Sequence, residues 1–440
     1  MRSDRRFSLC AAALALAVAA SSAAGNPQAL VGATVHPIAG PAIEDGAVVF
    51  QDGVIRAIGA RDDVVITGAT EVIEVEGLHL WPGLVDAATY LGLTEIGSVR
   101  GTVDVTESGP MNPNARAAVA VNASSSHFPV TRANGTLLAA SLPRGSLVPG
   151  HGAALALDGW TWEEMVRADP LGLVISWPSM ARERPGRGRG RGQRGDDEGE
   201  GPKWEERVAR LDDMVREGRA YLAARGDGAQ KRDADVRWES LAAVLEGRVP
   251  VWVAAGSLAQ IRAALDWTEK HGLNMVLLDG GRSGGDAWRV AQELASRDVP
   301  VVTRTNRVPR RRYEPYDTPF TAPAKLYERG VRIAFGSFNA AHARALPQEA
   351  ARAVTFGLPR DAACRALTLG AAEVLGIAER YGSLEVGKSA TFILVDGDLL
   401  DTRMQVERAW LDGQPVDLES KHVRLWKRWR ARPQARGEGG

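Results

Sequence analysis

The middle of the chain alternates short, continuously apolar runs with longer helical patterns, and this alternation constrains the fold more than any other feature. Strands that are apolar throughout are typical of parallel sheets covered by helices on both faces. Their repetition from about His79 to Leu375 predicts an α/β fold with a (β/α)8, TIM-like barrel. An open doubly wound sheet is the alternative, because periodicity does not reveal whether a sheet closes. The clearest runs are 251–254, 275–278, 299–302 and 331–335.

Both ends of the chain are rich in β-strand signals. Near the N-terminus, Asp52-Gly53 separates two apolar runs, which is a strong hairpin signal. Near the C-terminus, strands are expected at 390–395 and 406–411, and Asp412-Gly413 follows as another turn. One β-rich segment precedes the barrel and the other follows it. We therefore expect a small composite β-sandwich domain from residues 25–78 and 380–418, with the barrel at 79–379.

Residues 1–24 have the layout of a secretory signal peptide. Arginines at the start precede an apolar run from Phe7 to Ala20, and small residues follow it. The run is too short to span a bilayer as a helix. The expectation is an exported protein, periplasmic or secreted, and the alternative is a buried N-terminal helix. The formal net charge of zero gives no indication of a nucleic acid partner.

Two further segments lie outside the expected barrel core. Residues 182–202 are rich in arginine, glycine and acidic residues, and we expect a disordered surface insert. Arg-Gly repeats can bind RNA, but this one lacks aromatic residues, so no nucleic acid partner is expected. Residues 419–440 form a basic tail with Leu425, Trp426 and Trp429 at helical spacing. This stripe fits either a membrane surface or packing on the protein's own body, and no integral membrane span is expected.

Four motifs together resemble one protein family. The first runs from Trp81 to Leu91 and contains Pro82-Gly83-Leu84-Val85-Asp86; the others are 367–376, 381–398 and 409–413. They are similar to the first barrel strand, the late helix, the Gly-Ser-Leu stretch and the closing hairpin of the amidohydrolase superfamily, in its imidazolonepropionase-like branch. The resemblance implies a metal-dependent barrel hydrolase that acts on non-peptide C–N or ester bonds.

The resemblance also implies where the metal ligands belong. The two histidines of the family's first strand fall on Ala88 and Tyr90, a later histidine on Ala254, and the aspartate after the last strand on Phe338. Zinc is the cofactor that the family leads one to expect, and it is held by imidazole, thiolate or carboxylate. Methyl groups and a benzyl ring do not coordinate such a cation. The sequence therefore lacks the usual metal site.

Three polar residues are candidates for a relocated catalytic site. Asp86 and Asp279 stand at the ends of expected strands, and His342 follows the last strand, where barrel active sites form. They could form an acid–base or metal cluster. In the structural alternative, Asp86 orients the first loop, Asp279 caps a turn and His342 is an ordinary loop residue. The seven histidines include no pair within four positions, so no local metal motif exists.

Two functions follow as hypotheses. One is an exported hydrolase of non-peptide C–N bonds with a rearranged or metal-independent site. The other is a catalytically inactive pseudo-hydrolase that serves as a binding or assembly scaffold, as a homo-oligomer or paired with an active, related amidohydrolase. Both place a small-molecule substrate or ligand at the barrel mouth. The fold alone does not decide between them, because chemistry belongs to the site.

Overall fold

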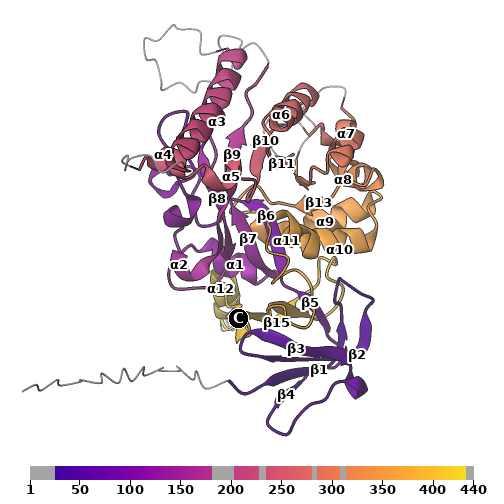
Figure 1. Ribbon diagram of the computed structural model, residues 1–440. Helices are drawn as coiled ribbons and strands as arrows, with labels where there is room; N and C mark the ends of the chain where they lie inside the picture. The colour runs from indigo at the N-terminus through magenta and orange to yellow at the C-terminus, as the bar shows by residue number, and fades with distance from the viewer. Residues whose placement is uncertain (1–24, 181–202, 227–233, 280–284, 308–313, 433–440) are drawn as a thin grey trace, which may run out of the picture.

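The computed structural model describes residues 25–180, 203–226, 234–279, 285–307 and 314–432. The expected signal peptide (1–24) and insert (182–202) lie outside these residues. The chain forms two sheets, one in a barrel surrounded by helices and the other in a smaller domain beneath it (Figure 1). This arrangement confirms the predicted α/β barrel with a β domain made from both termini.

The smaller sheet joins the two ends of the chain. It has eight strands in the order β16-β15-β14-β5-β1-β2-β3, with β4 paired to β1. The antiparallel pairing of β5 with β14 is the link between the N-terminal and C-terminal strands, and it extends the sheet to Pro82. The strands are β1 (Gln28–Val35), β2 (Ile43–Gln51), β3 (Val54–Ala60), β4 (Glu71–Glu74), β5 (His79–Pro82), β14 (Phe392–Val395), β15 (Val406–Leu411) and β16 (Gln414–Pro415).

The two Asp-Gly turns expected from the sequence lie against each other in this sheet. Asp52 and Gly53 have φ values of 52° and 78°, and Asp412 and Gly413 have 48° and 77°, so all four are left-handed as a two-residue hairpin turn requires. A Cβ atom on Gly53 would lie 2.8 Å from the Asp412 carbonyl oxygen. Glycine is therefore needed at position 53 both for its conformation and for the close approach.

The larger sheet has eight strands that follow one another in chain order. The first and last strands meet, because the Phe338 amide donates to the Ala88 carbonyl oxygen over 2.7 Å. This contact supports a nearly closed barrel over the open-sheet alternative. The strands are β6 (Leu84–Thr89), β7 (Thr136–Ser141), β8 (Gly150–Ala156), β9 (Val166–Ser176), β10 (Val251–Ala254), β11 (Met275–Leu278), β12 (Val301–Thr303) and β13 (Ile333–Phe335).

Strand β8 departs from the expected all-parallel arrangement. It runs antiparallel to both β7 and β9. The reversal follows from the short connections on its two sides, residues 142–149 and 157–165. A parallel crossover needs about a dozen residues or more, whereas an antiparallel connection can be short. The reversal places the β7–β8 loop at the end of the barrel where the other strands terminate.

The helices lie outside the barrel and follow the strands (Figure 1). Helix α6 begins with a capping box in which Ser257 and Gln260 satisfy each other's backbone amides. The helices are α1 (His127–Arg132), α2 (Trp162–Met165), α3 (Trp204–Gly226), α4 (Val236–Glu239), α5 (Ala242–Leu245), α6 (Leu258–Lys270), α7 (Ala291–Ser296), α8 (Thr318–Glu328), α9 (Leu346–Thr355), α10 (Arg360–Leu367), α11 (Leu369–Val374) and α12 (Lys421–Arg430). No helix within the described ranges combines the length and apolar character that a membrane crossing needs.

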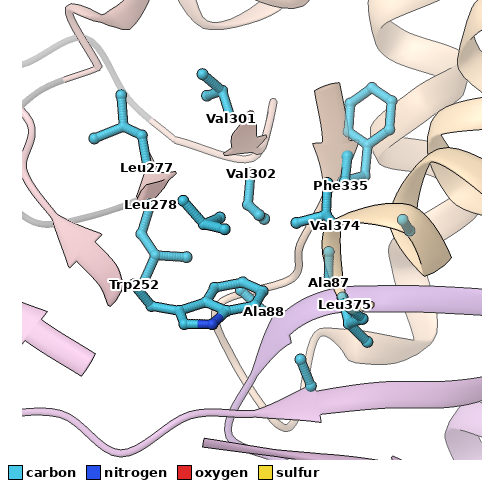
Figure 2. Close-up of a cluster of buried hydrophobic side chains, with 14 of the residues drawn as sticks. Ala87, Ala88, Trp252, Leu277, Leu278, Val301, Val302, Phe335, Val374 and Leu375 are labelled. Carbon is cyan, nitrogen blue, oxygen red and sulfur yellow. The ribbon is translucent and has the colours of Figure 1, made fainter. Parts of the chain in front are cut away.

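The barrel core explains the continuous apolar runs of the sequence. Consecutive residues such as Leu277 and Leu278, or Val301 and Val302, are both buried, since helices cover the outside and side chains fill the inside. Figure 2 shows these side chains with Trp252, Phe335 and others in one cluster. The cluster includes Ala88 and Leu278, which lie near the C-terminal ends of β6 and β11. Packed core therefore extends to this end of the barrel.

Candidate functional site

The C-terminal ends of the barrel strands surround a small pocket of about 50 Å³. All four positions at which the family resemblance places metal ligands line this single pocket, although they come from β6, the residue just after it, β10 and the loop after β13. The lining residues are Ala88, Thr89, Tyr90, Leu142, Pro143, Arg144, Val174, Ser176, Ala254, Leu278 and Phe338. The fold thus brings together the positions of a metal site with different side chains on them.

These side chains do not fit a divalent cation. The pocket wall has no imidazole, thiol or carboxylate, which are the groups that hold zinc in proteins. In the part of the chain that the structure describes, no group of three or more His, Cys, Asp or Glu is arranged to hold a metal. The disagreement with the family pattern therefore concerns the donor atoms themselves.

Two arginines lie over the aromatic rings at the former ligand positions. The Arg144 guanidinium carbon is 4.7 Å from the centre of the Tyr90 ring, and that of Arg304 is 5.3 Å from the centre of the Phe338 ring. Such cation–π contacts are favourable and hold a guanidinium in place. The mouth of the barrel therefore carries fixed positive charge near positions where a metal ion would otherwise supply it.

Arg144 is set in place by the loop between β7 and β8. Its amide donates to the Val105 carbonyl oxygen over 2.7 Å, and its carbonyl oxygen accepts from the Thr106 hydroxyl over 2.9 Å. The residue is exposed, and within the described ranges no carboxylate forms an ion pair with its guanidinium. A fixed guanidinium without a carboxylate partner, beside a pocket, is suited to an anionic ligand.

The side chain of Asp86 joins the first barrel strand to the last. It is fully buried, and its Oδ1 accepts from the Ser337 amide over 2.9 Å and from the Ala88 amide over 3.2 Å. Burial raises its pKa to about 7, although these hydrogen bonds oppose the shift. Asp86 does not line the pocket. Its contacts are those of a residue that closes the barrel.

Asp279 directly follows β11 and is 2 % exposed. Burial raises its pKa to about 8, against the opposing charge of Arg307. Its Oδ1 has no hydrogen-bond partner among the residues that the structure describes. Asp279 is adjacent in sequence to the lining residue Leu278 but is not itself part of the wall.

His342 lies on the surface. It precedes a short 3₁₀ helix (Ala343–Ala345), and its amide donates to the Asn339 side-chain oxygen over 3.1 Å. Within the described ranges, no hydrogen bond or ion pair connects it to Asp86 or Asp279. The three candidates from the sequence thus occupy three separate environments: a strand closure, a buried strand end and an exposed loop.

Sequence reasoning missed Glu349, which holds the loop after β12 in place. This residue of α9 is 5 % exposed, and its Oε2 accepts from the amides of Thr305 and Asn306, each over 2.7 Å. These bonds fix the loop after β12, which carries Arg304. The only sequence signal was an acidic residue in the first turn of a helix, which ordinarily indicates no more than a favourable interaction with the helix dipole.

Arg144 gave no signal in the sequence, because its position at the mouth depends on the reversal of β8.

Comparisons with known proteins agree with this architecture. A family model described as "Amidohydrolase family" matches residues 287–420. Amidohydrolase tasK of Hapsidospora irregularis is 25% identical over 199 residues, which is 44% of this chain and 20% of that protein. The chain therefore matches about a fifth of the length of this curated relative.

Solved structures show the same fold over nearly the whole chain. An amidohydrolase from Thermotoga maritima MSB8 superposes with a TM-score of 0.73 at 23% identity, covering 89% of this chain and 99% of that one. An adenosine deaminase from Xanthomonas campestris with bound zinc has a TM-score of 0.51 at 17% identity, covering 92% and 97%. Together, the family model, the sequence relative and these shared folds support the resemblance to the amidohydrolase superfamily that the sequence motifs indicated.

Proposed function

We propose that the barrel mouth of this protein binds a small organic anion and does not carry out the metal-dependent hydrolysis of its superfamily. One observation carries the proposal: Ala88, Tyr90, Ala254 and Phe338 line a single pocket, and Arg144 lies over one of their rings. In this proposal the chain is a degenerate amidohydrolase that serves as a binding scaffold. It acts alone, as a homo-oligomer, or beside an active, related enzyme.

The chemistry of guanidinium supports binding without hydrolysis. A catalytic zinc ion lowers the pKa of a bound water to about 7 and polarises the bond that is attacked. Arg144 supplies positive charge and several N–H donors, but it stays protonated at any physiological pH and cannot accept a proton from water. The site therefore holds an anion without generating a nucleophile.

The shape of the pocket indicates the size of the ligand. Leu142, Val174, Leu278 and Phe338 make much of its wall apolar, and its volume is about 50 Å³. Pockets for drug-sized ligands are several times larger. A short-chain carboxylate fits these features, with its carboxylate on Arg144 and its carbon chain against the apolar wall.

A second candidate is an acid–base hydrolase that uses Asp86 and Asp279. The observation in its favour is that both buried carboxyls have pKa values near neutrality, about 7 and about 8, as acid–base groups require. Against it, neither residue lines the pocket, and Asp86 is engaged with the backbone of Ser337 and Ala88.

We also propose that the protein acts outside the cytoplasm. The layout of residues 1–24 supports this, with early arginines, an apolar run and small residues at its end. N-terminal sequencing of protein expressed in its native host measures it directly. A mature start near Gly25 agrees with export, and a retained Met1 contradicts it.

Calorimetric titration with butyrate and with butyramide tests the anion site. The acid is expected to bind and the amide to bind at least tenfold more weakly, since a charge-assisted bond contributes about 1.5–3 kcal/mol. Arg144→Ala should lower the affinity for butyrate by roughly tenfold to a hundredfold. Arg329→Ala, which removes an exposed arginine after α8, is the matched control and should have no effect. Equal affinities for acid and amide, or an unaffected Arg144→Ala variant, would contradict the proposal.

The variant Asp279→Asn tests through the pH dependence of stability whether the buried carboxyl is protonated in the folded protein. The folded-state pKa of about 8 lies above the ordinary 3.8, so the native protein holds the proton more tightly than the unfolded chain does. The wild type should therefore lose stability as the pH rises from 4 towards 8, by up to about 1.4 kcal/mol per pH unit. The asparagine variant lacks this loss, so its advantage in free energy of unfolding should grow with pH.

Denaturant unfolding between pH 4 and pH 8 measures this difference. If the advantage of Asp279→Asn does not grow with pH, the buried carboxyl is not protonated as we describe. Assays of amide, lactam and ester hydrolysis on the same variant address the second candidate. Hydrolysis by the wild type that disappears in Asp279→Asn would favour the acid–base enzyme over the binding scaffold.

A further inference from the structure

Helix α12 (Lys421–Arg430) lies on the outside of the protein with no buried residue. It begins at Ser420, whose hydroxyl oxygen accepts from the Val423 amide over 3.2 Å as an N-cap. Val423 is the only half-buried position of the helix, and the other nine are exposed. The helix is therefore well formed at its start but only lightly attached to the rest of the chain.

The apolar face of α12 is turned away from the protein body. His422, Leu425, Trp426 and Trp429 follow the i, i+3, i+4, i+7 spacing that places side chains on one face of a helix. Leu425 is 39% exposed, Trp426 57% and Trp429 61%. From the sequence, this stripe fitted either a membrane surface or the protein's own body. The exposures show that it does not pack against the body.

The remaining faces of α12 are strongly basic. Within the described ranges, one of the helix cations is in an ion pair, between Lys427 and Glu419 over 3.0 Å. Two guanidiniums lie over the exposed indoles, Arg430 at 5.0 Å from the Trp426 ring centre and Arg432 at 5.6 Å from that of Trp429. The basic residues of the helix and its end are Lys421, Arg424, Lys427, Arg428, Arg430 and Arg432.

Another exposed tryptophan lies on a connection that α1 holds. Trp160 is 91% exposed, on the connection between β8 and β9. Arg132 of α1 holds this connection by donating to the Leu157 carbonyl oxygen over 3.0 Å. Helix α12 contacts the same helix, and α1, α2 and α12 lie together in Figure 1. Helix α1 thus contacts α12 and holds the connection that carries Trp160.

We propose that α12 docks the protein on an anionic lipid bilayer. Indole rings favour the interface between headgroups and acyl chains, and lysine and arginine bind lipid phosphates. A helix of this length is about 15 Å long, so it can lie in the interface but cannot span the bilayer. The occupant is lipid and not nucleic acid, because an exposed stripe made of one leucine and two tryptophans suits an apolar phase. This inference is independent of the anion site at the barrel mouth.

Co-sedimentation of the full chain with vesicles tests the proposal. The protein should bind vesicles of phosphatidylglycerol and phosphatidylcholine in equal parts, should not bind vesicles of phosphatidylcholine alone, and should dissociate as salt is raised. Trp426→Ala with Trp429→Ala should weaken binding by about tenfold or more, because two interfacial anchors are lost. Arg424→Glu with Arg428→Glu should weaken it by at least a similar factor, because these two reversals lower the net charge by about four units near an anionic surface.

Two control variants change similar residues elsewhere. Tyr316→Ala removes an aromatic side chain that is 77% exposed before α8, and Arg210→Glu reverses an exposed charge on α3; both should bind as the wild type does. Circular dichroism confirms that every variant is folded. Absence of binding to the anionic vesicles, or equal binding to both vesicle types, overturns the proposal. Binding to duplex DNA without binding to vesicles would also overturn it and would indicate a nucleic acid surface.

Discussion

The contact between the first and the last barrel strand is the constraint on which the rest of the structure depends. The Phe338 amide bonds to the Ala88 carbonyl oxygen, and the buried Asp86 carboxyl accepts the Ser337 amide. Strand β6 leaves the smaller sheet directly after β5, and the chain that follows β13 returns to that sheet at β14. Closing the barrel therefore also brings the two ends of the chain together, where β5 pairs with β14. Each sheet stabilises the other.

The same closure is made by the chain's own groups. Glycine at position 336 allows the last strand to approach Ala88 closely, since a Cβ atom there would lie 3.0 Å from both the Ala88 nitrogen and its Cβ. Hydrogen bonds and packing make the connection, and Phe338 fills space at the mouth while Arg304 lies over its ring. Arg144 and Tyr90 form the corresponding pair next to the end of the first barrel strand. In the proposed function, this positive charge can bind an anion but cannot activate water.

Much of the fold was predictable from the sequence because it rests on local patterns. The continuous apolar runs predicted the barrel strands β10 to β13, and Asp52-Gly53 and Asp412-Gly413 predicted turns of the composite domain. The reversal of β8 was not predicted, since it follows from the lengths of two connections whose ends were not visible in the pattern. Arg144 was missed for the same reason, because that reversal carries its loop to the mouth. Whether the tryptophans of α12 pack on the body was also open, since helical spacing defines a face but not its neighbour.

The claim that the mouth lacks the superfamily's metal chemistry is tested most directly by metal content and hydrolysis measured together. The purified chain is incubated with excess zinc, freed of unbound metal, and analysed for bound zinc and for hydrolysis of amides, lactams and esters. We predict zinc well below one ion per chain and no hydrolysis above the uncatalysed rate, because Ala88, Tyr90, Ala254 and Phe338 supply no imidazole or carboxylate to the pocket. One tightly bound zinc per chain, with hydrolysis that disappears when a chelator removes it, would contradict the account.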